Sequence, residues 1–254
     1  MNVLVCVKRV PETGARITLT PDAQAIDTSL LGFTISPHEE CAVEEALRIV
    51  EAHGGSTTVL TLGPAGATEQ LQNAMAMGVG AAVLLETDGH DWNAEATADA
   101  LAAAIRARPE PFDLLLFGNE AADTGDYQVP VRVAAALDLP CVNGVKGLEI
   151  RDGHVVCRRE AAGGGWEIYE VTLPAVVSVR EGINLPRYPS VPGRLRARKA
   201  DLQRTMPERR PGGPQMTKLR LPVEQAASAE VLGTGPEAAP RVVQVLDQIG
   251  VLGR

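Results

Sequence analysis

Aromatic side chains are scarce in this chain of 254 residues, since Phe, Trp and Tyr together make up only 3% of the sequence. Hydrophobic residues nevertheless make up 45%, so the volume of a core must come from Val, Leu, Ile and Ala. Because β-branched residues favour buried strands whereas Ala and Leu favour helices, this composition favours an α/β interior over an aromatic-rich β-sandwich. The length is sufficient to bury a full core, and we expect one large domain followed by a tail.

The sequence also lacks the features of nucleic-acid-binding and membrane proteins. Its formal net charge is -8, which argues against general nucleic-acid binding. No apolar run approaches the roughly 20 residues that span a bilayer. The segment MNVLVCVKRV at the start lacks the basic beginning and long apolar stretch of a signal peptide. We therefore expect a cytoplasmic protein that neither enters a membrane nor binds nucleic acid.

Metal-binding and catalytic motifs are missing as well. No C-x-x-C pair occurs and the histidines fall in unrelated segments, so neither a zinc site nor an iron–sulfur site is predicted. We interpret all eight Cys and His residues as structural or surface residues: Cys6, Cys41, Cys141, Cys157, His38, His53, His90 and His154. No Ser-His-Asp grouping, H-E-x-x-H motif or convincing carboxylate pair is present. This absence is typical of a protein whose chemistry belongs to a bound cofactor.

Short apolar runs alternate with helical patterns over the first 140 residues, which predicts a mostly parallel sheet flanked by helices. The strand candidates are continuous rather than alternating, as expected of strands buried on both faces. They span residues 2–7, 57–62, 81–85 and 113–117. The helix candidates span residues 37–52, 68–77, 94–106 and 127–137.

The helix predicted over residues 37–52 has a well-defined start. Ser36 can serve as the N-cap, Pro37 occupies the first helical position, and Glu39 completes a capping box. One face is apolar, with Val43, Ala46, Leu47 and Val50, and we expect the other face to hold the charged residues Glu40, Glu44 and Glu51.

The pattern changes after residue 140. Residues 145–150, 154–160 and 166–172 are β-like and are separated by turn residues, which predicts a hairpin with a returning strand, and residues 174–179 predict one more buried strand. Residues 205–240 are too rich in proline and glycine to form a core of their own. An apolar-periodic helix is predicted over residues 241–252, and it needs a surface to cover it. That surface is either a permanent partner or the protein's own domain.

In an open parallel sheet, ligands bind beyond the carboxyl ends of the strands. The strongest candidate there is the segment 118–128, in which a strand ends at Gly118, small residues follow, and the chain turns at Gly125 into a helix. Backbone N–H groups at a helix start can hold phosphate, although Glu120, Asp123 and Asp126 must then face away from it or bind the sugar and base. Taken alone, the segment is more typical of a plain β-to-α turn than of a nucleotide site.

Two further segments carry basic residues. Lys8 and Arg9 leave the first strand at the ligand end, where they fit either a cationic role near a phosphate or a solvated loop. Residues 182–201, GINLPRYPSVPGRLRARKAD, join a proline-spaced apolar tip to a basic run of Arg194, Arg196, Arg198 and Lys199. Because proline restricts φ and removes backbone donors, residues 185–193 are predicted to form a stiff loop. This loop either docks a partner or packs permanently on the protein's own sheet.

Four segments, in the same order, closely resemble the β subunits of electron transfer flavoproteins. They are VCVKRVPET at residues 5–13, SPHEECAVEEA at 36–46, GNEAADTGDYQVP at 118–130, and the loop at 182–201. In that loop Asn184, Pro186, Arg187, Tyr188 and Pro192 occupy the pattern positions, and Val191 stands where the family usually has leucine. The resemblance runs almost end to end and implies a Rossmann-like, adenine nucleotide hydrolase-like α/β domain over residues 1–200. Residues 201–254 would form a C-terminal arm with a terminal helix that wraps the partner subunit.

The resemblance also implies a set of ligand contacts. Transferred position by position, the family's pocket for AMP, or for a second FAD in bifurcating relatives, comprises Cys6, Ser36, Glu39, Leu62, Gly118, Asn119, Ala121, Asp123, Thr124, Gly125, Asp126, Tyr127, Gln128 and Val129. Residues 124–127 depart from the usual family pattern. The implied partner-docking residues are Tyr188, Val191, Pro192, Arg194, Arg196 and Lys199, with the side chain at 191 entering a pocket on a dehydrogenase.

For function, the resemblance implies an electron-carrier subunit without catalytic residues of its own. It would pair with an α subunit that holds most of a redox FAD, take electrons from acyl-CoA dehydrogenases of fatty acid β-oxidation or other flavin dehydrogenases, and pass them to a quinone oxidoreductase. This chain would supply the scaffold, a structural AMP and the partner anchor. Two alternatives remain: a bifurcating component with a second FAD in place of AMP, and a stand-alone nucleotide-binding sensor module.

Overall fold

A mixed sheet of nine strands forms the centre of the computed structural model, which describes residues 1–12, 14, 16–222 and 229–252. The strand order is β11-β5-β4-β1-β6-β10-β7-β8-β9. Seven strands are parallel: β1 (Asn2–Cys6), β4 (Ser56–Gly63), β5 (Ala81–Glu86), β6 (Leu114–Gly118), β7 (Cys141–Arg151), β10 (Ala175–Val179) and β11 (Gln203–Thr205). The antiparallel strands β8 (His154–Glu160) and β9 (Trp166–Thr172) extend one edge. The predicted mostly parallel α/β fold with a hairpin region is confirmed.

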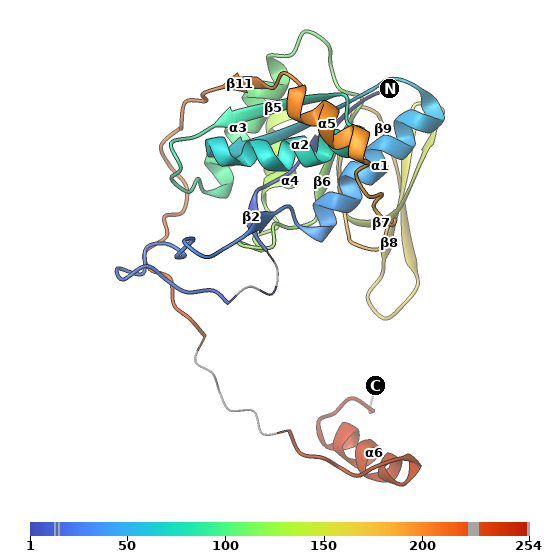
Figure 1. Ribbon diagram of the computed structural model, residues 1–254. Coiled ribbons are helices and arrows are strands. Elements are labelled where there is room, and N and C mark those ends of the chain that lie inside the picture. Colours follow the sequence, from blue (N-terminus) through green and yellow to red (C-terminus); the bar gives the residue numbers. More distant parts are fainter. Residues whose placement is uncertain (13, 15, 223–228, 253–254) are drawn as a thin grey trace. The chain divides into compact units, whose positions relative to one another are not determined.

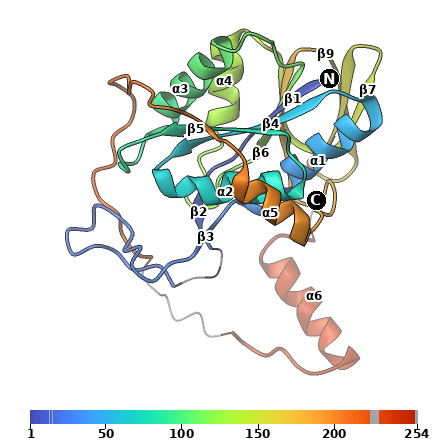
Figure 2. The same ribbon diagram turned by 45° about the horizontal axis from the view of Figure 1, so that its top comes forward.

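Helices cover the parallel part of the sheet on both faces (Figures 1 and 2). One face is covered by α1 (Pro37–His53) and α2 (Thr68–Met77), with α5 (Val191–Lys199) packed against α2. The opposite face is covered by α3 (Ala94–Arg106) and α4 (Val129–Leu137). Gly193 allows α5 to lie this close to α2, because a Cβ there would collide with the carbonyl oxygen of Ala76.

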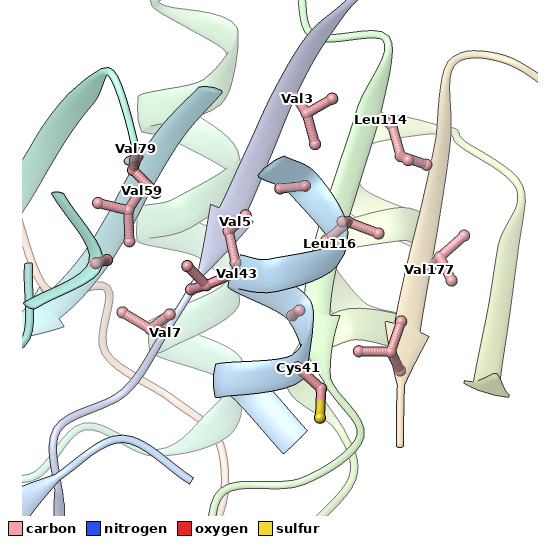
Figure 3. Packing of buried hydrophobic residues seen from close by; sticks show 14 of the residues in the cluster. Val3, Val5, Val7, Cys41, Val43, Val59, Val79, Leu114, Leu116 and Val177 are labelled. Atoms are coloured by element: carbon pink, nitrogen blue, oxygen red, sulfur yellow. The ribbon is translucent and has the colours of Figure 1, made fainter. Parts of the chain in front are cut away.

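Alternation along the central strand divides the interior into two cores. Val3, Val5 and Val7 point toward α1 and join a cluster that includes Val43, as Figure 3 shows. Leu4 and Cys6 point the opposite way, into the cluster that contains the α3 and α4 side chains. Because successive side chains of a strand face opposite sides, a continuous apolar run such as β1 supplies both cores at once.

Several boundaries differ from the predicted ones for local reasons. The helix expected from residue 127 begins at Val129, because Tyr127 has a positive φ of 58° and cannot belong to a right-handed helix. The stiff loop expected to last through residue 193 ends at Ser190. The Ser190 hydroxyl accepts a hydrogen bond from the Gly193 amide and caps α5, while Pro192 lies in the first turn, where its missing N–H costs nothing. The strand expected at 145–150 is longer and begins at Cys141.

Three short elements and an extension were not predicted. β2 (Val10–Pro11) and β3 (Phe33–Thr34) form a small antiparallel sheet, η1 (Ala65–Ala67) precedes α2, and β11 adds to the edge of the main sheet beyond residue 200. The chain divides into two compact units, Met1–Lys218 and Leu219–Arg254.

The second unit contains η2 (Pro236–Ala238) and α6 (Ala239–Gln248). The predicted helix is therefore present, although it begins two residues earlier than expected and ends at Gln248. None of the α6 side chains is buried. Part of the proline-rich stretch, residues 223–228, lies outside the described residues. Within the described ranges, the helices are all too short or too polar to cross a membrane.

Candidate functional site

The carboxyl ends of β1 and β6 meet at the point where the strand order reverses. From β1 the chain continues to β4 and β5 on one side, and then β6 is added on the other side of β1. Cys6 ends β1 opposite Phe117, which directly precedes Gly118. The region beyond the strand ends at such a reversal is the usual ligand position in open α/β sheets, and we call this region the crevice.

Glu39 of α1 occupies the base of this crevice. Its carboxylate accepts one hydrogen bond from the Lys8 amide (Oε1, 3.0 Å) and one from the Ser36 amide (Oε2, 3.0 Å). The predicted capping box is thereby confirmed, and the same side chain ties the loop after β1 to the start of α1. Burial raises the pKa of Glu39 to about 8, although the two amides and the nearby Lys8 ammonium oppose that shift.

Gly118 allows β6 to approach this helix start. A Cβ atom at Gly118 would lie 2.6 Å from Cγ of Glu39 and 3.2 Å from Cβ of His38, closer than side chains pack. The site therefore requires glycine because of the proximity of α1, while the φ of Gly118 is not in the left-handed region.

The segment after Gly118 is shaped by its own side chains. Asp123 accepts a hydrogen bond from the Thr124 amide at 2.8 Å, and Asp126 accepts one from the Gln128 amide at 3.3 Å. The Gly125 amide bonds the Ala121 carbonyl, and Gly125 itself has a φ of 56°. Of the backbone donors expected at the start of α4, the Gln128 amide is thus already engaged, and Pro130 has none. The amides of Val129 and residue 131 remain at this helix start.

Charges at the crevice are largely paired. The Lys8 ammonium lies 2.7 Å from Asp123, and His38 Nε2 lies 3.4 Å from the Glu120 carboxylate. His38 Nδ1 also accepts a hydrogen bond from the Glu181 amide at 2.7 Å, so the ring contacts two segments at once. Arg9 leaves the crevice, because its guanidinium stacks on Phe33 with 3.2 Å to the ring centroid.

All fourteen predicted ligand residues lie at or beyond the carboxyl ends of the strands, and they differ in burial. Cys6, Ser36, Glu39 and Gly118 are buried and form the base of the crevice, and burial raises the pKa of the Cys6 thiol. Partly buried or exposed residues surround them: Leu62, Asn119, Ala121, Asp123, Thr124, Gly125, Asp126, Tyr127, Gln128 and Val129. Ser36 joins these two groups, since its hydroxyl donates to the Glu120 carbonyl at 3.2 Å.

These residues fit a nucleotide better at its sugar and base than at a charged phosphate. The Gly118 approach and the small side chains at 121 and 125 leave the backbone accessible, and hydroxyls and carboxylates suit a ribose. For a phosphate, the crevice offers Lys8 and the start of α4, against the carboxylates of Glu120, Asp123 and Asp126. An open depression of about 700 Å³ lies elsewhere, lined in part by Met1, His53 and Asp113 at the amino ends of the strands.

The predicted docking residues lie on the loop before α5 and on α5 itself. Tyr188 is 95% exposed and Val191 is 73% exposed. Pro192, Arg194, Arg196, Arg198 and Lys199 are also exposed. Leu185 and Leu195, which were not among the predicted docking residues, are exposed apolar side chains like Tyr188 and Val191.

Sequence reasoning missed how this loop is attached to α1. Arg187, named above only as a family pattern position, pairs with Glu44 and Glu51. Glu44 was expected on the solvent side of α1 but is buried. The sequence did contain one sign that Glu44 is paired rather than solvated. Arg48 lies four residues after it, residues four apart on a helix can pair, and these two pair here at 2.8 Å.

The fold and the crevice define an open, doubly covered α/β protein whose polar groups gather at the switch point of the sheet. Comparison with known proteins identifies it further. Residues 25–208 match the family model described as "Electron transfer flavoprotein domain". The chain therefore belongs to the electron transfer flavoprotein β-subunit family, as the resemblance implied.

Relatives in three organisms carry the name electron transfer flavoprotein subunit beta. The protein of Syntrophomonas wolfei is 35% identical over 91% of this chain and 90% of its own length. That of Bacillus subtilis is 34% identical over 80% of this chain and 78% of its own. That of Mycobacterium bovis is 38% identical over 79% of this chain and 77% of its own.

Proposed function

We propose that this chain is the β subunit of a heterodimeric electron transfer flavoprotein. The observation that supports this most directly is the match to relatives with that name over up to 91% of the chain. The partner would be an α subunit that holds most of one FAD, which supplies the redox chemistry when bound. Electrons would come from acyl-CoA dehydrogenases or other flavin dehydrogenases and go to a quinone oxidoreductase.

The chain's own residues support a binding and positioning role rather than a catalytic one. We propose that the crevice beyond β1 and β6 holds AMP. Ser36, Asn119 and the carboxylates would face the sugar and base, while Lys8 and the start of α4 would face the phosphate, with Lys8 exchanging its pairing with Asp123 for the ligand. The fixed base formed by Glu39 and Gly118 would keep the crevice in shape when the nucleotide leaves.

Cofactor content of the co-expressed α and β chains tests this assignment. One flavin and one AMP per heterodimer are expected from acid extraction, optical spectra and chromatography. Two flavins and no AMP would instead establish a bifurcating component with a second FAD at the crevice. If the β chain purified as a stable monomer that binds nucleotide and ignores a co-expressed α chain, the sensor function would replace the proposed one.

We further propose that Tyr188 and Val191 anchor the dehydrogenase. Both side chains are exposed on a loop stiffened by proline, and the basic residues of α5 would steer an acidic partner surface. Val191→Ala should raise the KM of an acyl-CoA dehydrogenase for this protein by about 3- to 10-fold, since each buried methylene contributes about 0.8 kcal/mol. FAD and AMP content should not change. Steady-state reduction assays measure this effect, and an unchanged KM would contradict the anchor.

A further inference from the structure

The loop between β10 and α5 is exposed at its tip and firmly attached at its base. Leu185, Tyr188 and Val191 are between 73% and 95% exposed. Asn184, directly before the first of these positions, and Arg187, between the first two, turn their side chains back toward α1. These two polar residues therefore hold the loop, while Leu185, Tyr188 and Val191 face solvent.

Arg187 makes the main attachment, to two carboxylates about two helical turns apart on α1. Its Nε donates to Glu44 Oε2 at 2.8 Å and its Nη2 to Glu44 Oε1 at 3.1 Å. Its Nη1 and Nη2 donate to the two oxygens of Glu51, at 2.5 Å and 3.0 Å. The Arg187 amide also donates to Glu44, at 3.1 Å, so that both backbone and side chain are fixed. We call Arg187, Glu44 and Glu51 the brace.

Asn184 makes a second attachment one step earlier in the loop. Its Nδ2 donates to the Cys41 carbonyl and to Glu45 Oε2, both at 2.9 Å. These contacts hold the loop against α1 at Asn184, three residues before Arg187. The two attachments thus enclose Leu185 between fixed points and leave Tyr188 directly beyond the second one.

The brace is strong because one of its carboxylates is almost completely removed from water. The Glu44 side chain is 3% exposed, whereas that of Glu51 is 58% exposed. Burial alone would raise the pKa of Glu44, but hydrogen bonds from Arg187 and Arg48 hold that pKa below its ordinary value. Removal of Arg187 would leave a buried carboxylate with Arg48 as its remaining cation, which is costly in a poorly hydrated place.

We propose that Arg187 is a positioning residue for partner docking: the brace holds the loop in its binding conformation before the partner arrives. This inference rests on the proposed docking function of Tyr188 and Val191. A loop that is already ordered loses less conformational entropy on association, so the brace improves affinity without touching the partner. Arginine is required because its planar fork contacts two carboxylates at once, which a lysine ammonium cannot do with the same geometry.

The test uses the co-expressed complex with Arg187→Gln, Arg187→Lys, Glu51→Gln and, as a matched control, Arg151→Gln. Arg151 also donates two hydrogen bonds to one carboxylate, that of Glu149, but it lies on the β7–β8 ribbon. Hydrogen exchange of residues 182–190 is measured in the complex alone. The KM and kcat are measured with a purified acyl-CoA dehydrogenase.

Arg187→Gln should speed exchange in residues 182–190 and raise KM on the order of 10-fold, which corresponds to the loss of hydrogen bonds to a charged group. The kcat and the nucleotide content should stay unchanged. Glu51→Gln keeps the pairing of Arg187 with the buried Glu44, so it should raise exchange and KM less than Arg187→Gln does. This milder variant keeps the test valid if Arg187→Gln fails to fold. Arg187→Lys should restore part of the KM, and Arg151→Gln should change neither measurement.

Unchanged exchange in Arg187→Gln would overturn the brace, whatever the partner does. A rise in exchange without a rise in KM would also overturn it, provided that Val191→Ala raises KM in the same assay. If Val191→Ala and Arg187→Gln both leave KM unchanged while exchange rises, the docking function itself fails. The two failures are therefore distinguishable.

Discussion

Gly118 is the residue at which β6 comes closest to α1, and a single methyl group there would press on Glu39 and His38. Gly118→Ala should therefore lower the free energy of unfolding by about 1–3 kcal/mol, the usual cost of forcing extra volume into a packed site. It should also reduce the nucleotide content of the purified protein, since Glu39 moves with the base of the crevice. Gly66→Ala is the control, because its Cβ would meet nothing nearer than 3.8 Å. Urea unfolding of both variants measures the difference, and equal losses would contradict the close approach.

Glu39 should make stability depend on pH in a direction opposite to that of most carboxylates. Its pKa is raised from about 4.5 to about 8, so the folded protein keeps a proton that the unfolded chain has lost. Stability is then full below about pH 4.5 and falls as pH rises through about 8, with a limiting slope of about 1.4 kcal/mol per pH unit.

Glu39→Gln should flatten this decline between pH 5 and pH 8 in urea unfolding, even though the amide replaces one hydrogen-bond acceptor with a donor. The control is Glu149→Gln, whose exposed carboxylate has a pKa lowered by Arg151 and does not titrate in this range. That variant should keep the wild-type decline. A Glu39→Gln curve parallel to the wild-type curve would show that Glu39 is ionised throughout.

At the scale of elements, α1 contacts both candidate interaction regions. Its first turn holds the crevice through Ser36, His38 and Glu39, and its middle and last turn hold the docking loop through Glu44 and Glu51. His38 also joins the two, because it pairs with Glu120 on one side and accepts from the Glu181 amide on the other. One amphipathic helix therefore positions two regions that are 60 residues apart in sequence.

Helices and strands could be predicted from the sequence where nearby residues determine their start and end. The Ser36 capping box and the apolar run of β1 both act within a few residues, and the helices over Thr68–Met77 and Ala94–Arg106 have the predicted bounds. The strand order, and hence the meeting of β1 with β6, followed from the rules for parallel sheets only in general terms.

What remained unpredicted depends on partners distant in sequence. β11 forms because Gln203–Thr205 pairs with the edge of β5, and no local sequence pattern predicts this pairing. Glu44 is buried because Arg187, 143 residues later, pairs with it. Helical periodicity predicts that a charged residue such as Glu44 faces solvent. An arginine that precedes other arginines, as Arg187 does, is likewise typical of a solvated patch. The same limit hid the pairing of Lys8 with Asp123, which leaves the crevice with little free positive charge.

At the scale of the whole molecule, the division at Lys218 separates two tasks. Among the described residues, all strands, both cores, the crevice and the docking loop lie within Met1–Lys218, whereas the second unit contributes η2 and α6, neither of which has a buried side chain. The second unit cannot owe its order to a core of its own, and an apolar helix face is most stable when a partner covers it. We propose that this arm binds the α subunit.

A chain ending at Lys218 should therefore fold and yet lose its α subunit. Circular dichroism and urea unfolding should remain close to those of the full chain, because the elements that form the sheet and its covering helices are all retained. Co-purification with a tagged α subunit should fall by at least 10-fold. In the full chain, Val245→Asp with Leu246→Asp should weaken co-purification, because both side chains belong to the apolar face of α6 that the α subunit would cover, whereas Gln244→Asp on the opposite face should not. An unfolded truncated chain would show that the arm completes the first unit, and an intact complex would show that the α subunit binds elsewhere.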